Sequence, residues 1–270
     1  MLEQYKQQLL ADFNTRSNYD QGRFYQPIAN KLVSLTHLQS GQKVLDIATG
    51  TGLVALNVAE IVGVRGEVIG VDISRGMLAQ AREKQVKLNL QNVEFIEADA
   101  EAVNFQENSF DIIFCSLALC YLTNLPQVLK NWFNWLKPGG KIAFNSWQEK
   151  AFNPSVLFRE VAAQYNIKIP NPNAPLGTPA KCYDALSAVG FQNIEIHSEQ
   201  FGWYYHPDTE TAMNLWKMNA KNVFGFQVYQ LSPEKLQECQ AEYMSKIQML
   251  PTTENGTWCD ALIYFVLATK

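Results

Sequence analysis

Several features are scarce or missing in this chain, and each absence excludes a class of protein. The 270 residues contain no apolar run of about 18 residues, so we expect no membrane-spanning helix. The 22 basic residues are outnumbered by 26 acidic ones, which gives a formal net charge of −4. A nucleic-acid-binding surface normally requires a basic excess, so we expect no nucleic-acid partner.

Cysteine and histidine are also few, and neither forms a ligand pattern. The five cysteines, at positions 115, 120, 182, 239 and 259, include no C-x-x-C pair. An odd, scattered set favours reduced thiols over disulfides or a zinc site, so we predict a cytoplasmic protein without a metal ion. The N-terminal segment MLEQYKQQLLADF is polar and amphipathic, unlike a signal peptide.

What is present is a regular alternation of strand and helix patterns. Hydrophobic residues make up 47% of the chain, and we find no internal repeat, so we predict a single domain over 1–270. Short apolar runs predict strands at 43–48, 67–72, 93–99, 110–119 and 141–147. Helical spacing predicts helices at 53–62, 77–90 and 125–136. Strands that are apolar on both faces and alternate with helices indicate a doubly wound α/β sheet.

Polar residues and glycines gather where these strands end. Ligands of doubly wound sheets bind at the carboxyl ends of the strands. At or near those ends lie Asp46, Gly50, Gly52, Asp72, Asp99 and Ser116. The sequence therefore predicts a ligand site at this edge of the sheet.

The glycine turn permits two interpretations. Gly50-x-Gly52-x-x-Ala55 fits a dinucleotide fingerprint, and Asp72 lies 20 residues beyond Gly52 (72 − 52), as expected of a ribose-binding acid. Asp46 argues against a dinucleotide, because it would repel a pyrophosphate by roughly 4 kcal/mol at about 4 Å and an effective dielectric constant of about 20. A ligand with an ammonium and no phosphate, such as S-adenosylmethionine, reverses that sign. A nicotinamide-dependent oxidoreductase remains the alternative.

Four segments together resemble a known enzyme family. They are VLDIATGTG (44–52), GVDISRGMLAQAREK (70–84), EADAEAVNFQENSFDII (97–113) and LKPGGKIAF (136–144). In this order they resemble the class I S-adenosylmethionine-dependent methyltransferases, and their wording is most similar to the ubiquinone/menaquinone-biosynthesis C-methyltransferases and their small-molecule relatives. The resemblance covers about 40–147. It implies a mostly parallel, seven-stranded Rossmann-like sheet, with 191–205 and 257–270 as the antiparallel strands that complete it.

The resemblance also assigns roles to site residues. Asp46 would hold the methionine ammonium, Asp72 the two ribose hydroxyls, and Asp99 the adenine amino group, with the Ala100 N–H facing the ring. Each of these acids also has a structural interpretation, as an ion-pair partner or a helix cap. Further cofactor contacts would come from Tyr19, Ala48, Gly50, Gly52, Ile73, Met77 and Ser116.

The remaining segments should hold the methyl acceptor. Residues 1–40 resemble the lead-in helices of the family, and 206–256 have a helical pattern that predicts a lid before the last strand. Large rings near this lid indicate an apolar, aromatic or terpenoid small molecule as the partner, although each ring could simply be core. As substrate contacts we expect Phe24, Trp203, Tyr205 and Trp216.

Catalytic residues are the least determined by the sequence. Relatives often carry histidines after the fourth strand, where this chain has Cys120-Tyr121. His206 follows an aromatic strand on the ligand side and is the candidate base, with Tyr121 second. A base is needed only if the acceptor must lose a proton, and the sequence leaves carbon, nitrogen and oxygen acceptors open. A cofactor-binding module without turnover is the other alternative.

Overall fold

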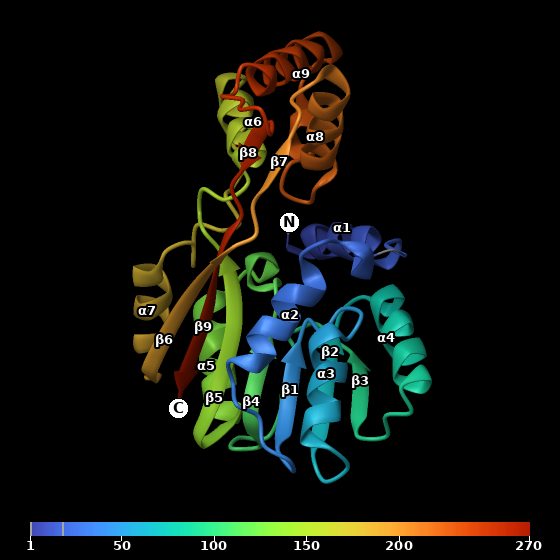
Figure 1. Cartoon of the computed structure of the whole chain (residues 1–270), viewed down its shortest axis with the longest axis vertical. Helices are drawn as coiled ribbons and strands as arrows, with labels where there is room; N and C mark the ends of the chain where they lie inside the picture. The colour runs from blue at the N-terminus through green and yellow to red at the C-terminus, as the bar shows by residue number, and fades with distance from the viewer. Residues whose placement is uncertain (1, 18) are drawn as a thin grey trace. The chain divides into compact units, whose positions relative to one another are not determined.

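A seven-stranded sheet organises the first of two compact units in this computed structural model, which describes residues 2–17 and 19–270. Residues Met1–Ser146, Pro179–His197 and Tyr264–Lys270 form this first unit, and Trp147–Thr178 and Ser198–Ile263 form the second. Figure 1 shows the elements of both. The single-domain organisation over 1–270 stays a prediction.

The sheet has the strand order β3-β2-β1-β4-β5-β9-β6. Its first five strands in that order are mutually parallel. Gly139 N–H donates to the Lys270 carbonyl and Lys270 N–H to the Gly140 carbonyl, which place the end of β9 beside the start of β5. Strand β9, the last in the chain, therefore runs antiparallel to β5, and the predicted fold is confirmed. The strands are β1 (Lys43–Ile47), β2 (Glu67–Asp72), β3 (Val93–Glu97), β4 (Phe110–Cys115), β5 (Leu136–Trp147), β6 (Gln192–Gln200) and β9 (Leu262–Thr269).

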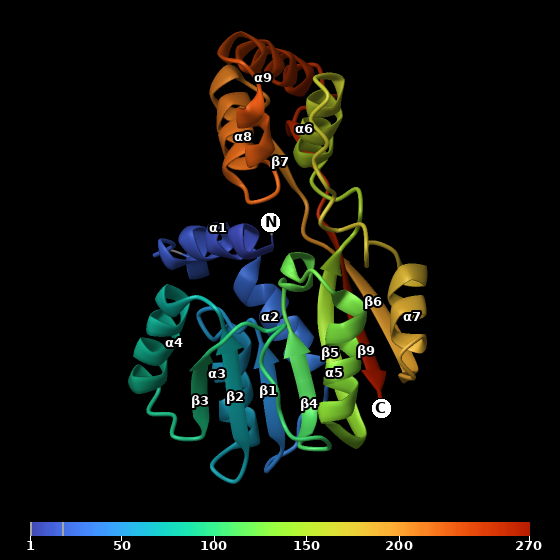
Figure 2. The ribbon, with the colours of Figure 1, turned by 180° about the vertical axis from the view of Figure 1, so that it is seen from behind.

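Helices cover both faces of this sheet. In Figure 1 α2 and α3 lie in front of it, and Figure 2 shows α5 over the opposite face. Helix α1 lies beyond the arrowheads of β1 and β2, at the carboxyl ends of the strands. The helices and 3₁₀ turns of the first unit are α1 (Leu2–Asn14), η1 (Tyr19–Gln21), α2 (Tyr25–Ser34), α3 (Leu53–Val62), α4 (Arg75–Lys87), η2 (Leu119–Tyr121), α5 (Leu125–Trp135) and α7 (Pro179–Ser187).

Several element boundaries differ from the predicted ones for identifiable reasons. Helix α4 begins at Arg75 rather than Met77, because the Ser74 hydroxyl caps it by accepting from the Met77 N–H. Strand β5 begins at Leu136 rather than 141, because the Lys270 backbone pairs with its glycines. Strand β4 ends at Cys115 rather than at 119, because three loop residues and the 3₁₀ turn η2 follow it.

The second unit is mainly helical. It contains α6 (Asn153–Gln164), α8 (Thr209–Lys221), η3 (Phe226–Gln230), α9 (Pro233–Gln248) and a ribbon of β7 (Trp203–Tyr205) with β8 (Thr257–Cys259). Phe158, Trp216 and Tyr243, one from each helix, pack together in its core, and Phe158 meets the other two rings edge-on. The predicted lid, 206–256, lies within this unit, and its role as a lid stays a prediction.

Two segments that the sequence predicts as single strands are interrupted. The segment 191–205 breaks after Gln200, and 257–270 breaks after Cys259. The side chain of Gln200 stabilises the backbone at both breaks. Its Nε2 donates to Asp260 Oδ1, and its Oε1 accepts from the Gly202 and Ala261 N–H groups. A Cβ at Gly202 would lie 2.2 Å from the Trp258 ring, so the break also needs glycine there.

Candidate active site

The turn after β1 is built from left-handed backbone. Ala48, Gly50 and Gly52 have φ values of 53°, 55° and 78°. A Cβ on Gly52 would meet Phe95 at 3.1 Å, whereas a Cβ on Gly50 would meet nothing within 4 Å. Gly52 therefore serves the packing of the turn, and Gly50 is the glycine that leaves space open.

Asp46 is held inside this turn. Its side chain is 1% exposed, and its Oδ2 accepts from Thr49 Oγ1 at 2.6 Å and the Ala55 N–H at 3.1 Å. Burial raises the pKa of Asp46 to about 7, against the effect of both hydrogen bonds. A cation placed beside this carboxylate would be favourable, because it would offset the cost of burying the charge.

Asp72, the last residue of β2, ties two loops together. Its Oδ2 accepts from the Gly50 N–H and its Oδ1 from the Ser74 N–H, both at 2.8 Å. Burial raises the pKa of Asp72 although these hydrogen bonds oppose the shift. A carboxylate oxygen has a second lone pair, so Asp72 can still accept from two ligand hydroxyls.

Two adjoining clefts lie at this edge of the first unit. The larger cleft has mostly apolar walls and is lined by Lys6, Leu9, Phe13, Asp72, Ile73, Met77, Asp99, Ala100, Glu101, Ala118, Tyr121 and Leu122. The smaller cleft is lined by Tyr25, Ala29, Asp46, Thr49, Thr51, Leu53 and Val54. Both are lined by Tyr19, Ala48, Gly50, Ser116 and Leu117. The structure thus brings together ten of the eleven predicted cofactor residues, all except Gly52.

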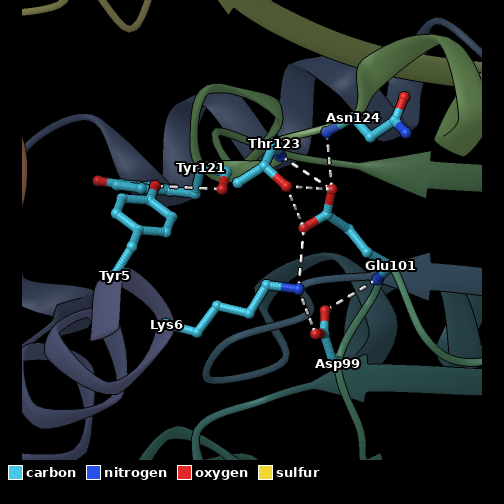
Figure 3. Close-up of polar contacts among 7 residues, drawn as sticks. All are labelled: Tyr5, Lys6, Asp99, Glu101, Tyr121, Thr123 and Asn124. Atoms are coloured by element: carbon cyan, nitrogen blue, oxygen red, sulfur yellow. Dashed lines mark hydrogen bonds and ion pairs between the residues drawn. The ribbon is translucent and has the colours of Figure 1, made fainter. Parts of the chain in front are cut away.

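Asp99 is paired with a residue that the sequence analysis missed. Lys6, on α1, donates to Asp99 Oδ2 at 2.5 Å and lies 3.1 Å from Glu101 Oε2 (Figure 3). Asp99 Oδ1 accepts from the Glu101 N–H. Lys6 sits in an amphipathic helix 93 residues before Asp99, and no local spacing signals the pairing.

Asn145 is a second missed residue, and it shapes the loop after β4. It is 1% exposed, its Oδ1 accepts from the Leu117 N–H at 2.6 Å, and its Nδ2 donates to Ser116 Oγ at 3.0 Å. Leu117 has a φ of 56°, an uncommon conformation for leucine, and Asn145 holds it there. The sequence did contain a signal for Asn145, because it is a polar residue near the carboxyl end of an otherwise apolar strand.

Three tyrosines line the clefts: Tyr19 lines both, Tyr25 the smaller and Tyr121 the larger. Tyr19 stacks on Tyr25 with ring centroids 4.2 Å apart, and Tyr121 meets Phe13 edge-on at 5.4 Å. Asp20 anchors the Tyr19 segment through hydrogen bonds from Thr51 and Lys84. Burial raises the phenol pKa values of Tyr19 and Tyr121, so both remain protonated at neutral pH. Tyr121 can therefore contact or donate to a ligand, but it is not available as a base.

The other predicted site residues lie elsewhere. Phe24 precedes α2 and lines neither cleft, and the Arg23 guanidinium lies 5.4 Å from its ring centroid. Trp203, Tyr205 and His206 belong to the second unit, where His206 is exposed.

Trp216 has a packing role. It is 4% exposed and lies against Phe158 and Tyr243 in the core of the second unit, so a substrate could not reach it without unfolding that core. We therefore do not retain Trp216 as a substrate contact.

The described residues add two negative findings. In residues 2–17 and 19–270, no group of three or more His, Cys, Asp or Glu side chains could hold a metal ion. Over the same ranges, every helix is too short or too polar to cross a bilayer.

Known proteins resemble this chain in sequence and in fold. Aklanonic acid methyltransferase DauC of Streptomyces sp. (strain C5) is 34% identical over 145 residues, which cover 53% of this chain and 66% of DauC. The ubiquinone/menaquinone biosynthesis C-methyltransferase UbiE of Cronobacter sakazakii (strain ATCC BAA-894) is 37% identical over 123 residues, covering 45% of this chain and 49% of UbiE. The matches thus span about half to two thirds of these relatives.

A solved structure and a family profile agree with these relatives. A methyltransferase from Bacillus halodurans C-125, described as putative, superimposes with a TM-score of 0.63 at 21% identity, over 90% of this chain and 98% of that one. The methyltransferase domain family matches residues 38–202, more than half of the chain. Together with the clefts at the carboxyl ends of the parallel strands, this match shows that the chain belongs to the class I S-adenosylmethionine-dependent methyltransferases.

Proposed function

We propose that this protein transfers the methyl group of S-adenosylmethionine to a small, largely apolar molecule. The observation that carries the proposal is the position of Asp46, a fully buried carboxylate with a raised pKa at one end of a cleft system whose other end is apolar. S-adenosylmethionine has a complementary arrangement: an ammonium at one end, two hydroxyls in the middle and a flat base at the other.

The residues present fit that cofactor from end to end. Asp46 would hold the ammonium in the smaller cleft, and Asp72 would accept from the ribose hydroxyls where the clefts meet. Ile73 and Met77 would flank the adenine in the larger cleft, with Asp99 at its edge. When bound, the cofactor supplies an electrophilic methyl group on a sulfonium. The chain's own task is to exclude water and align the acceptor with that methyl group.

The same site is unfavourable for a nicotinamide dinucleotide. A pyrophosphate beside the Gly50 turn would face the Asp46 and Asp72 carboxylates, and both lie in poorly hydrated surroundings. Like charges in such a site repel by several kcal/mol, about 4 kcal/mol at about 4 Å with an effective dielectric constant of about 20. A hydride-transfer role would need a cation near the turn, where the structure places two acids.

We infer an aromatic or terpenoid acceptor from two observations. The β7–β8 ribbon of the second unit carries exposed aromatic rings, with Tyr204 48% and Trp258 39% exposed. Relatives with the names aklanonic acid methyltransferase and ubiquinone/menaquinone biosynthesis C-methyltransferase act on small molecules rather than on nucleic acids. The second unit, including Trp203 and Tyr205, would then contact the acceptor as the predicted lid.

His206 is the candidate base if the acceptor has a proton to lose. It stands two residues before Asp208, whose carboxylate caps α8 by accepting from the Thr211 N–H. Two first-unit groups that follow β4, the Cys120 thiol and the Tyr121 phenol, are poor bases, because burial raises the pKa of the thiol to about 12 and the pKa of the phenol well above its usual value. The substitution His206→Ala should slow methylation of a phenol, relative to the wild type, but not methylation of an amine. If the variant methylates both acceptors as well as the wild type does, the role of His206 as a base is disproved.

Two measurements test the function. Calorimetry with S-adenosylhomocysteine and with NADH should show binding of the first only. Transfer of labelled methyl groups to a panel of hydroquinones, polycyclic phenols and terpenoid alcohols should then yield a labelled product. Binding of NADH alone would overturn the proposal. Binding of S-adenosylhomocysteine without transfer to any panel member or to components of a metabolite extract would favour a binding module without turnover.

A further inference from the structure

Lys6 forms a three-residue ion cluster at the rim of the larger cleft, which we name the Lys6 triad: Lys6, Asp99 and Glu101. We propose that Lys6 is a positioning residue that holds helix α1 and Asp99 in place around the adenine end of the cofactor and so slows cofactor release. The inference rests on the proposed function, because it concerns the cofactor named there.

The Lys6 triad is partly shielded from solvent. The side chains of Lys6, Asp99 and Glu101 are 18%, 24% and 11% exposed. Burial acts against the charged form of Lys6, but hydrogen bonds and charge from Asp99 and Glu101 outweigh it and raise the Lys6 pKa. The ammonium is therefore charged throughout the neutral range, and screening by salt is weaker than for an exposed pair.

Glu101 extends the cluster to the loop after β4. Its carboxylate accepts from the Thr123 N–H and hydroxyl and from the Asn124 N–H, in addition to facing Lys6 (Figure 3). Burial alone would raise the pKa of Glu101, but these donors and Lys6 lower it. Lys6 thus joins α1 to the loop after β3 and, through Glu101, to the loop that follows Tyr121.

A second tie joins the same helix to the same loop. The Tyr5 hydroxyl donates to the Tyr121 carbonyl at 3.1 Å. One and two turns further along α1, Leu9 and Phe13 line the larger cleft. The polar ties at Tyr5 and Lys6 therefore fix the helix whose apolar side chains form a wall of the site.

Helix α1 depends on such ties because little of it is buried. None of the described residues from 4 to 27 falls in the fully buried class. At the far end of the helix, Asn14 Oδ1 accepts from Ser74 Oγ and from the Gly76 N–H, so this end too is held by polar contacts. A segment with few buried apolar contacts opens at low free energy, and removing one tie should raise the open population measurably.

Asp99 is affected directly. Lys6 holds Asp99 Oδ2 while the Glu101 N–H holds Oδ1, so the carboxylate cannot rotate. Each oxygen keeps one lone pair, which suits acceptance from the amino group of a purine. Without Lys6 the two carboxylates would repel each other, and Asp99 would lose its fixed orientation.

The experiment compares Lys6→Met with Lys6→Arg and with the control Lys43→Met. Lys43 forms a similar ion pair with Glu67, 2.9 Å apart. Both residues lie at the amino ends of their strands, β1 and β2, whereas the site lies at the carboxyl ends. Stopped-flow release of S-adenosylhomocysteine is measured at low and high salt, together with hydrogen exchange of the α1 amides in ligand-free protein. Melting temperatures of all variants show whether each is folded.

We expect Lys6→Met to release S-adenosylhomocysteine about three to ten times faster than the wild type, the range expected for losing two partly shielded ion pairs. Its release should no longer depend on salt, and its α1 amides should exchange faster. Lys6→Arg should restore most of the slow release, and Lys43→Met should behave like the wild type. Wild-type release and α1 exchange in folded Lys6→Met would overturn the inference while leaving the proposed function intact. A wild type that binds no S-adenosylhomocysteine would overturn the proposed function itself.

Discussion

The Gly50 N–H donates to Asp72 Oδ2 at 2.8 Å, so the ribose-binding candidate also fastens the glycine turn. We predict that Asp72→Ala weakens S-adenosylhomocysteine binding by roughly 2–3 kcal/mol. The substitution removes charge-assisted hydrogen bonds to the ligand, and it also removes the hydrogen bond that fixes the glycine turn. Calorimetry measures this loss. Asp111→Asn is the matched control: Asp111 accepts from the Lys43 N–H and from Lys137 at the far end of the sheet. Equal binding losses in both variants would refute a specific role for Asp72.

Asp46 should make stability depend on pH. An aspartate in an unfolded chain has a pKa of about 3.9, whereas burial raises that of folded Asp46 to about 7. The folded state therefore binds more protons between these values, and its stability should fall as pH rises from about 4 to about 7. Asp46→Asn keeps an acceptor for Thr49 and Ala55 but has no proton to lose. Denaturant unfolding across this range should show a shallower decline for Asp46→Asn than for the wild type.

Cofactor binding should shift the same proton. An ammonium beside Asp46 favours its ionised form, so binding at about pH 6 should release a proton, and affinity should rise until about pH 7. Calorimetry in two buffers of different ionisation enthalpy counts the proton. Asp46→Asn should release none and should bind with little dependence on pH. Proton uptake by the wild type would contradict the assignment of Asp46 to the ammonium.

The two glycines of the turn should respond differently to alanine. Both need left-handed backbone, so each substitution costs about 1–2 kcal/mol of stability in strain. Gly52→Ala also forces a Cβ against Phe95, Ala81 and Leu56, which should add about 1–3 kcal/mol. Gly50→Ala meets no protein atom and should instead obstruct the ligand. Melting temperature and S-adenosylhomocysteine affinity should therefore separate the pair, Gly52→Ala losing mainly stability and Gly50→Ala mainly binding.

Alanine substitutions of two tryptophans in the second unit should have different effects. Trp216→Ala removes a core ring that packs on Phe158 and Tyr243, and we expect a loss of about 3–5 kcal/mol of stability. Trp203 is half-buried on the β7–β8 ribbon, so Trp203→Ala should leave folding largely intact and raise the acceptor KM. Unfolding curves and steady-state kinetics measure the two effects. An unchanged acceptor KM in Trp203→Ala would remove it from the proposed acceptor contacts.

The core of the sheet was predictable because strong local patterns and tertiary structure agree there. Residues 53–62 and 67–72 form their helix and strand with the predicted limits, since each is bounded by glycines or charges that stop it. The site followed from topology, because residues at the carboxyl ends of parallel strands must meet. Five residues that were predicted for this reason line the clefts: Asp46, Gly50, Asp72, Asp99 and Ser116.

The features that the sequence did not predict depend on contacts between distant segments, which local patterns do not reveal. Lys6 meets Asp99 across 93 residues, and Gln200 reaches across 60 to break two strands at once. Trp216 was assigned to the substrate because an aromatic ring at helical spacing looks the same whether it faces a ligand or a core. Only the positions of Phe158 and Tyr243 distinguish these cases.

The division of the chain also bears on how acceptor preference can change in evolution. The polypeptide passes between the two units four times, after residues 146, 178, 197 and 263, so neither unit is encoded by a continuous stretch of gene. A recombined or cloned cassette carrying 198–263 alone would bring Trp216 and Tyr243 without Phe158, the residue on which both pack. If the second unit contacts the acceptor, as we propose, acceptor preference should therefore change by coupled point substitutions in 147–178 and 198–263 rather than by exchange of one continuous segment.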